Sequence, residues 1–294
     1  MHIKLNFVGA FMGVPCDENS TAGDIIDFIL DHNEVPLEYA ALCAILEIRA
    51  DNFGYPLSPN EPIVRFENAK NALHFRVLSI PTAMKAETLH PNFQELLHNQ
   101  IHRLIVTRTW ACPDDWVYKF AAYRCGIEFG DFNPSSHKIG FFTKTLQQMV
   151  PADVIASFKQ KEIEQEILLE WSVLTAQKKT SPHQTAVMNY LKSCQEQVRQ
   201  YGCATFVARL TQIDDEPQDL YVYFGLRMEG YLILDPDGNE TASFSYKSAK
   251  IDWPADDDQD LTITSQGVTY KMEMNGIKAM KSVGEFLMQA KLPE

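Results

Sequence analysis

The spacing of the apolar residues changes twice along the chain, and this change limits the folds available to it. Apolar residues alternate near the start, at Ile3, Leu5 and Phe7, and alternate again after Gly202. Between these two regions they follow a helical period. Alternation suits a half-buried strand and a period near 3.6 suits a helix, so neither an all-helical nor an all-strand fold fits. The sequence predicts an α+β chain with three parts.

The first part, residues 1–82, mixes strands with one helix. Thr21 to Asp24 forms a capping box that opens the apolar run ending at Ile29. Two further strands are expected at Ala41 to Ile48 and Ala72 to Ile80, on either side of a loop-like stretch from Tyr55 to Pro62. The order strand, strand, helix, strand, strand is typical of a ubiquitin-like roll.

The second part, residues 90–200, predicts a compact helical bundle. Helices are expected at Pro113 to Tyr123, over one long segment from Val154 to Leu174, and after Ser181-Pro182. The apolar side of each expected helix carries residues at helical offsets: Trp116, Phe120 and Tyr123 in the first; Ile163, Ile167, Leu168 and Trp171 in the second; Val187, Tyr190, Leu191, Cys194 and Val198 in the third.

The third part, residues 202–294, alternates again and ends in one helix. Strands are expected at Ala204 to Leu210 and Leu220 to Arg227, followed by a hairpin whose turn is Asp235 to Glu240 and by two further strands. The closing helix, Ile277 to Lys291, presents Ile277, Met280, Val283 or Gly284, and Leu287 to whatever it covers. This pattern predicts a small barrel or bent sandwich closed by a helix.

Charge and composition exclude several classes of protein. A net charge of −13 disfavours electrostatic binding of nucleic acid, which needs basic residues to replace phosphate counterions. The sequence contains neither a long apolar run nor a basic N-terminal region followed by an apolar one, so it predicts no membrane span and no signal peptide. A cytosolic protein is therefore expected.

No catalytic or metal motif is apparent, and neither an enzyme nor a cofactor is expected. The six cysteines are scattered without a CxxC pair, which indicates reduced filler rather than disulfides or a zinc site. Phosphate-loop, HExxH and GxSxG patterns are absent. The remaining enzymatic alternative is a hidden Cys/His pair, such as Cys112 near His102, which would require a thiolate of low pKa.

Several short stretches carry a family resemblance. Ala121 to Phe132, His137 to Phe142, Met149 to Ile155 and the junction Val198 to Leu210 resemble corresponding segments of talin's FERM domain. The order of the three parts is similar to that of FERM modules in general. The resemblance implies a three-lobed FERM module: a ubiquitin-like roll, a helical bundle like that of acyl-CoA-binding protein, and a phosphotyrosine-binding or PH-like β-sandwich with a C-terminal helix.

The resemblance also implies a function. FERM domains are non-catalytic adaptors that link the cytoplasmic tails of receptors to the cytoskeleton or to signalling proteins at the membrane periphery, in cell adhesion among other settings. In the talin-like module a tail bearing Asn-Pro-x-Tyr adds a strand to the third lobe, in the groove between its fifth strand and its C-terminal helix. By position, the peptide-binding residues here would be Ser248, Ala249, Lys250, Ile251, Asp252 and Trp253 on the strand, with Ile277, Met280 and Lys281 on the helix.

Strand addition has its own physical basis. An edge strand offers unpaired N–H and C=O groups that an extended peptide can satisfy, while pockets at alternate residues select its sequence. Trp253 could form an apolar wall of the groove or fill the core, and the residues alone leave both readings open. Pro254 cannot donate a ladder hydrogen bond, so pairing is expected to end there.

The charge of the third lobe departs from that of talin. Residues 202–294 carry eight basic and sixteen acidic residues, a net charge of −8, and Asp252 occupies the place of an arginine in talin. An anionic membrane repels such a lobe, and an acidic groove favours a peptide with basic flanks. Weak lipid contact is left to the second lobe, through Lys138 and Lys144 or Lys178 and Lys179, although a solvated surface explains these lysines equally well.

A second use of the module would be as an effector of a Ras-family GTPase bound through the first lobe. GTPase-binding lobes of this kind use basic strands. Residues 1–80 carry only five basic residues against eleven acidic ones. This function is therefore the alternative, together with phosphoinositide binding through the first and second lobes.

Overall fold

The computed structural model describes residues 2–7, 9–67, 73–253 and 259–290. The chain divides into two compact units: Met1–Ala83 together with Gly202–Glu294, and Met84–Tyr201. The second of these is called the helical unit below. Across the described ranges, every helix is too short or too polar to cross a membrane.

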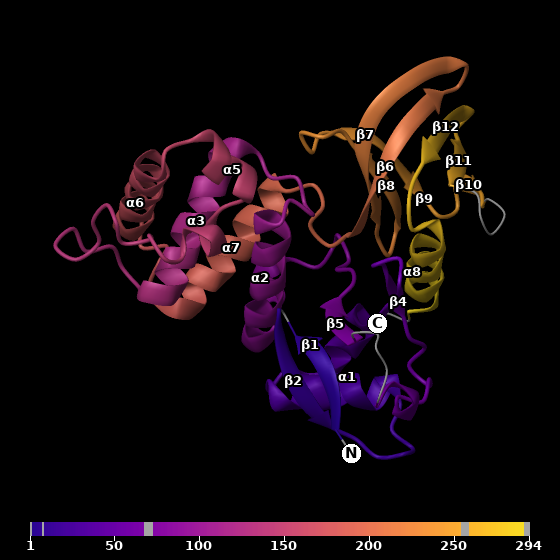
Figure 1. The fold of residues 1–294 in the computed structure, drawn as a ribbon, viewed down its shortest axis with the longest axis horizontal. Helices are drawn as coiled ribbons and strands as arrows, with labels where there is room; N and C mark the ends of the chain where they lie inside the picture. Colours follow the sequence, from indigo (N-terminus) through magenta and orange to yellow (C-terminus); the bar gives the residue numbers. More distant parts are fainter. Residues whose placement is uncertain (1, 8, 68–72, 254–258, 291–294) are drawn as a thin grey trace. The chain divides into compact units, whose positions relative to one another are not determined.

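The first lobe, within residues 1–82, is a five-stranded mixed sheet with one long helix (Figure 1). The strand order is β2-β1-β5-β3-β4, with β1 and β5 parallel. Thr21 and Asp24 form the expected capping box at the start of the helix. The elements are β1 (His2–Phe7), β2 (Ala10–Pro15), α1 (Ala22–His32), η1 (Leu37–Leu42), β3 (Cys43–Ile48), β4 (Gly54–Pro56), η2 (Val64–Phe66) and β5 (Leu73–Val77).

One strand of this lobe lies partly in the stretch expected to be a loop. β4 contains Tyr55 and Pro56, and it pairs with β3 through Glu47 and Tyr55. A stretch of three residues is too short to show the alternation that predicts a strand, and the proline at the end of β4 also disfavours a strand. Pairing with β3 supplies the hydrogen bonds that local sequence does not predict.

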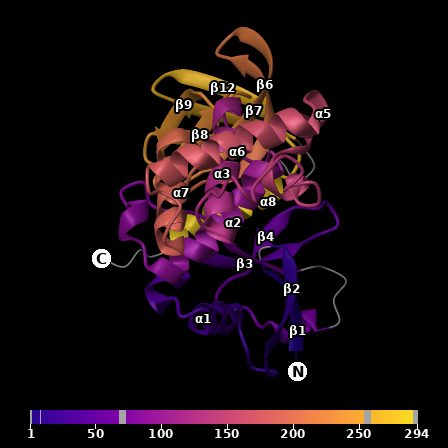
Figure 2. The ribbon, with the colours of Figure 1, turned by 90° about the vertical axis from the view of Figure 1, so that its left-hand side faces the viewer.

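The helical unit packs its longer helices side by side. α3 contacts both α6 and α7, and α2 contacts α7, as the two views of the ribbon also show (Figures 1 and 2). The residues expected to line the apolar sides of α6 and α7 are buried. The elements are η3 (Ala86–Thr88), α2 (Pro91–Val106), α3 (Asp114–Phe129), α4 (Leu146–Met149), α5 (Ala152–Ser157), α6 (Gln160–Ala176) and α7 (His183–Gln197).

The expectation of one continuous helix from Val154 to Leu174 is wrong. The chain leaves the helical conformation at Phe158 and Lys159, both of which are extended, and α6 begins at Gln160. Glu162 caps the new helix by accepting from the Lys159 N–H at 3.2 Å. Apolar spacing continues through the break, which is why the pattern alone predicts a single helix.

The third lobe, within residues 202–294, is a seven-stranded antiparallel sheet with a C-terminal helix. The strand order is β10-β11-β12-β6-β7-β8-β9, so β9 and β10 are its two edges. The elements are β6 (Ala204–Ile213), β7 (Glu216–Leu226), β8 (Gly230–Leu234), β9 (Glu240–Ser245), β10 (Ala249–Asp252), β11 (Asp260–Ser265), β12 (Val268–Glu273) and α8 (Ile277–Gln289).

The first and third lobes share one hydrophobic core within their unit. Ala44 and Leu78 of the first lobe belong to the same buried cluster as Phe224, Ile263 and Met280 of the third. The peptide N–H of Ile80 also donates to the Gly202 carbonyl at 3.2 Å, where the chain returns to this unit. The shared core makes these two lobes a single compact body.

Candidate functional site

Strand β10 forms one edge of the third lobe's sheet. It pairs with β11 through Lys250 opposite Thr264 and Ile251 opposite Ile263. The strand order ends at β10, and no strand among the described residues pairs with its other side. The outer backbone groups of this edge are therefore available to an added strand.

A short turn sets the point at which β10 begins. The Ser248 N–H donates to the Ser245 carbonyl at 3.1 Å, and the Ser245 hydroxyl donates to the Ser248 hydroxyl at 3.0 Å. The Ser265 hydroxyl, from β11, donates to the Ser248 carbonyl at 3.0 Å. These bonds fix the register of β10 against β11.

Alternate residues of β10 face opposite ways. Ala249 and Ile251 are half-buried and pack against the third lobe's core, whereas Lys250 and Asp252 are exposed on the outer face. Lys250 Nζ lies 2.9 Å from Asp252 Oδ1, and their side chains are 77% and 58% exposed. One face of the edge strand is thus apolar and the other carries one charge of each sign.

Trp253 combines features of the two roles considered for it, a core residue and a wall of the groove. It is half-buried and packs against the core cluster of the third lobe. Lys281 Nζ, from α8, lies 5.9 Å from the centroid of its ring, within the range of a cation–π contact. Trp253 therefore joins the end of β10 to α8. Pro254 and the acidic residues Asp256 to Asp258 lie outside the described residues.

Two helix residues expected to form the opposite wall are not on the surface. Met280 is fully buried and Ile277 is 8% exposed, and both belong to the core cluster. Their apolar side chains pack into the core of the third lobe and leave little surface for a docked peptide. Of the three helix residues expected to bind peptide, only Lys281 is exposed, and peptide binding by Ile277 and Met280 stays a prediction that their burial disfavours.

The exposed stripe of α8 that contains Lys281 continues to two residues that the sequence reading missed. Glu285 and Met288 follow Lys281 by four and seven residues and are also exposed, Met288 by 55%. These offsets place the three on one face of a helix. Reading the polar face of the helix with the same period as its apolar face would have identified them.

The four lysines suggested for lipid contact lie on two segments of the helical unit. Lys138 and Lys144 are exposed between α3 and α4, and Lys178 and Lys179 follow α6. The exposed side chains of Ile139 and Phe141 lie between the first two lysines in sequence. Lipid contact at these positions remains a prediction.

Basic residues of the first lobe are engaged within the lobe. Arg49 Nε lies 2.9 Å from Glu47 Oε2, and Arg65 pairs with Glu61. Lys4 Nζ lies 4.3 Å from the centroid of the Phe11 ring. Lys70 falls outside the described residues. A partner that binds through basic residues of these strands would have to compete with these contacts.

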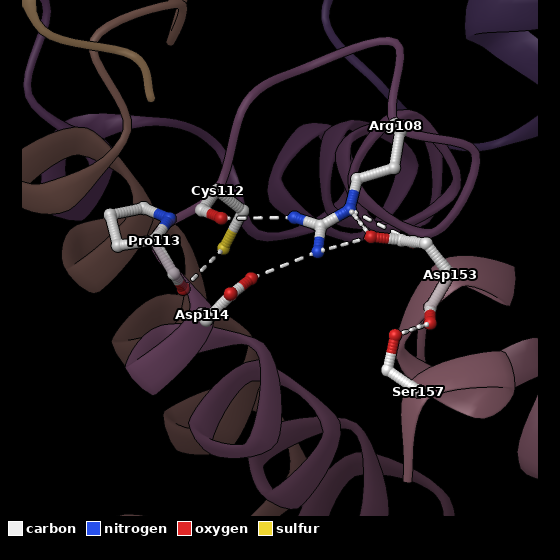
Figure 3. A network of polar contacts seen from close by, with 6 residues as sticks. All are labelled: Arg108, Cys112, Pro113, Asp114, Asp153 and Ser157. Carbon is white, nitrogen blue, oxygen red and sulfur yellow. Dashed lines mark hydrogen bonds and ion pairs between the residues drawn. The ribbon is translucent and has the colours of Figure 1, made fainter. Parts of the chain in front are cut away.

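The Cys112 and His102 side chains do not form a reactive pair. Burial raises the pKa of the Cys112 thiol to about 12, and this thiol donates to the Pro113 carbonyl at 3.6 Å (Figure 3). Burial lowers the pKa of His102 to about 4, and its ring lies 2.8 Å from the Gln148 carbonyl and 3.2 Å from the Tyr190 hydroxyl. A neutral thiol cannot act as the nucleophile that the enzymatic alternative requires.

The surroundings of Cys112 indicate a structural role. Arg108 donates to the Cys112 carbonyl, to Asp114 and to both carboxylate oxygens of Asp153, and so joins the loop before α3 to the start of α5 (Figure 3). All six cysteines are free and five are buried. Among the described residues, no group of three His, Cys, Asp or Glu side chains is arranged to hold a metal ion.

Sequence comparison relates the chain to one domain family. The FERM central domain matches residues 85–206. Human Merlin is 24% identical to the chain over 230 residues, which are 77% of this chain and 35% of Merlin. Merlin from Rattus norvegicus is also 24% identical over 230 residues. The chain therefore spans about a third of the length of these curated relatives.

Solved structures show the same fold across the whole chain. The FERM domain of Drosophila Merlin, in complex with its C-terminal domain, matches with a TM-score of 0.70 at 12% identity and covers 98% of this chain and 97% of that chain. The MyTH4-FERM domain of human Myosin 7b, in complex with harmonin-a PDZ3, matches with a TM-score of 0.73 at 14% identity over 98% of this chain and 60% of that chain. The α+β, three-lobed fold expected from the sequence is confirmed.

Proposed function

Because this chain belongs to the FERM domain family, we propose that it is a non-catalytic adaptor that binds short protein tails by strand addition to β10. The bound segment would be a receptor cytoplasmic tail, of the Asn-Pro-x-Tyr type in a talin-like module. The adaptor would work on the cytoplasmic side of the plasma membrane, where it would connect its partner to the cytoskeleton or to signalling proteins.

The observation that carries this proposal is the open edge of β10. Main-chain groups on that side have no partner strand among the described residues, and the half-buried Ile251 and Trp253 lie beside it. An added strand would gain backbone hydrogen bonds along β10 and apolar contact near Trp253. On the helix side, the candidate contacts are Lys281, Glu285 and Met288.

The solved relatives support a protein partner in general terms. The FERM domain of Drosophila Merlin is in complex with a C-terminal domain, and the Myosin 7b MyTH4-FERM domain is in complex with a PDZ domain. Modules of this fold therefore accept protein ligands. The choice of a linear tail, and of β10 as its site, is our proposal for this chain.

A pair of proline substitutions tests strand addition. Successive N–H groups of a strand point to opposite edges, so Lys250→Pro and Ile251→Pro remove amides on different sides of β10. One variant disrupts the ladder to β11, while the other removes an outward amide and keeps the lobe folded. We expect the variant with native thermal unfolding to lose peptide binding.

The ligands for this test come from an array of receptor cytoplasmic tails with and without Asn-Pro-x-Tyr. Bound peptides would then be remade with N-methyl groups on alternate amides, because one set of amides faces β10 and the other faces solvent. We expect methylation of one set to abolish binding and of the other to leave it unchanged. Unchanged binding by the folded proline variant, or equal tolerance of both methylated sets, would overturn the proposal.

The alternative function is weak membrane contact through the helical unit. The observation in its favour is that Ile139, 48% exposed, and Phe141, 37% exposed, lie between Lys138 and Lys144 in sequence. Apolar side chains flanked by lysines suit the interface of an anionic bilayer. Sedimentation with phosphatidylserine vesicles tests it, and Ile139→Ser/Phe141→Ser should remove any pelleting. The GTPase alternative has no comparable support, because Lys4, Arg49 and Arg65 of the first lobe are engaged within the lobe.

A further inference from the structure

We propose that Lys250 and Asp252 select the partner by the order of its charges, so that the preferred peptide reads apolar, basic, apolar, acidic from N to C. This inference rests on the proposed function, since it concerns the same edge strand. It specifies the partner's residues at positions that an Asn-Pro-x-Tyr motif alone does not define.

The first step is the geometry of the strand. Residues two apart in a strand point to the same face, and Lys250 and Asp252 do so on the exposed side of β10. Their neighbours on β11 are Thr264 and Thr262, which carry no charge. Across β10 and the positions of β11 paired with them, Lys250 and Asp252 are therefore the charged residues on the face that an added strand would continue.

The second step is the direction of the added strand. The described pairs in this sheet are all antiparallel, including β10 with β11. Antiparallel pairing is also somewhat more stable per residue than parallel pairing. An antiparallel peptide that places a residue opposite Asp252 places the residue two further along opposite Lys250.

The third step is charge complementarity across the two strands. Directly opposite side chains lie about 5 Å apart, where opposite charges attract and like charges repel. A basic residue suits the position opposite Asp252, and an acidic residue suits the position opposite Lys250. The residues between and before them face the same way as Ile251 and Trp253, which favours apolar side chains there.

Binding by a matched peptide adds to a contact that the free protein already has. The free protein holds Lys250 Nζ 2.9 Å from Asp252 Oδ1, so each charge is already neutralised by the other. A peptide with the matched order offers each of them a second partner. A peptide with the reversed order puts like charges opposite both, unless it binds in the parallel direction.

The experiment uses the full chain and three sets of synthetic peptides. Each peptide carries the block Val-Lys-Val-Asp, Val-Asp-Val-Lys or Val-Thr-Val-Thr, followed by Asn-Pro-Val-Tyr directly or after one, two or three serines. Affinities are measured by fluorescence anisotropy. We expect the best peptide of the basic-first set to bind about tenfold more tightly than the best of the acidic-first set.

The matched control exchanges the two charges on the protein. The double variant Lys250→Asp/Asp252→Lys keeps the composition, the net charge and the ion pair within the strand, and it should invert the preference between the two sets. The double variant Lys250→Thr/Asp252→Thr should abolish the preference while it still binds the neutral set. Thermal unfolding verifies that both variants are folded.

The outcomes separate this inference from the function beneath it. If the neutral set binds but the order of charges has no effect, or the acidic-first set is preferred, the charge selection is wrong and strand addition stands. If no set binds the wild-type chain, strand addition of such tails fails and the charge selection fails with it.

Discussion

At the scale of single residues, two histidines are buried in the core of the helical unit. His98 and His102 lie on successive turns of α2 with ring centroids 6.1 Å apart. Both are buried beside Tyr190 of α7, and within the described part of the chain neither ring nitrogen of His98 has a hydrogen-bond partner. Burial, with the positive charge of Arg124 as a smaller cause, lowers the pKa of His102 to about 4. The unit therefore folds around neutral imidazoles.

This burial predicts that the helical unit loses stability in mild acid. The unfolded chain protonates His102 below about pH 6.5, while the folded chain does so only near a pKa of about 4. The stabilisation is complete above the unfolded pKa and is lost as the pH falls between the two values. From about pH 7 to about pH 5, we expect the free energy of unfolding to fall by about 2 kcal/mol from this residue.

Urea unfolding of the wild-type chain and of His102→Gln, measured across this pH range, checks the prediction. Glutamine does not titrate, so the variant should show a shallower dependence on pH by the same amount. The pKa of His98 is lowered in the same direction, chiefly by burial, and should leave a residual slope in the variant. Identical slopes in the two proteins would contradict the assignment to His102.

At the scale of elements, the contact between the β3–β4 turn and the start of α8 holds the first and third lobes together. Gly276 precedes α8 with a φ of +80°, and a Cβ there would lie 2.6 Å from the Phe53 ring. Only glycine combines this backbone conformation with so close an approach. The first turn of α8 is therefore positioned by a residue of the first lobe.

Gly276→Ala should lower the free energy of unfolding through both backbone strain and steric overlap with Phe53. Gly267→Ala is the matched control, because it introduces backbone strain alone. Gly267 has a φ of +85°, and nothing lies within 4 Å of the Cβ that an alanine would add, so Gly267→Ala should lower the free energy of unfolding by about 1 kcal/mol through backbone strain. Gly276→Ala adds overpacking against Phe53 to this strain, and should lower the free energy of unfolding by about 2 to 4 kcal/mol in all.

Chemical denaturation of the two variants measures these costs, and a double-mutant cycle with Phe53→Ala isolates the steric part. In the Phe53→Ala background, the cost of Gly276→Ala should fall to that of Gly267→Ala. Equal costs for the two glycine variants in the wild-type background would show that the ring does not constrain α8.

At the scale of the whole molecule, one of the two compact units is built from two separate segments of the chain. The first and third lobes form one unit although the helical unit lies between them in the chain. The chain leaves this unit after Ala83 and returns at Gly202, whose carbonyl accepts hydrogen bonds from the Ser79 hydroxyl at 2.7 Å and the Ile80 N–H at 3.2 Å. The points of departure and return are therefore close together.

This arrangement predicts that the first and third lobes fold without the helical unit. A chain in which a short Gly-Ser linker replaces residues 84–201 should unfold in one cooperative transition and keep the peptide affinity of the intact protein, because β10, Trp253 and α8 all remain. Calorimetry and peptide titration check both points. Two separate transitions, or a molten chain, would show that the shared core is too small to hold the lobes together.

The sequence by itself determined the order of the lobes and the faces of most helices. Periods of two and 3.6 are set by backbone geometry within a few residues, so the buried sides of α6 and α7 and the hairpin around Asp235 to Glu240 could be predicted. The capping box at Thr21 and Asp24 is equally local. The location of the candidate edge strand, though not its surroundings, followed from the family resemblance.

Tertiary structure decided the features that depend on residues far apart in the chain. Only packing against the sheet determines that Met280 is buried while Lys281, one residue later, reaches Trp253. Only pairing with β3 makes a strand of Gly54–Pro56, and only the fold brings Ala44 and Leu78 into the core of the third lobe. A local period states which residues share a face of an element. It does not state which other element will cover that face, because that depends on the free energy of the whole packed core.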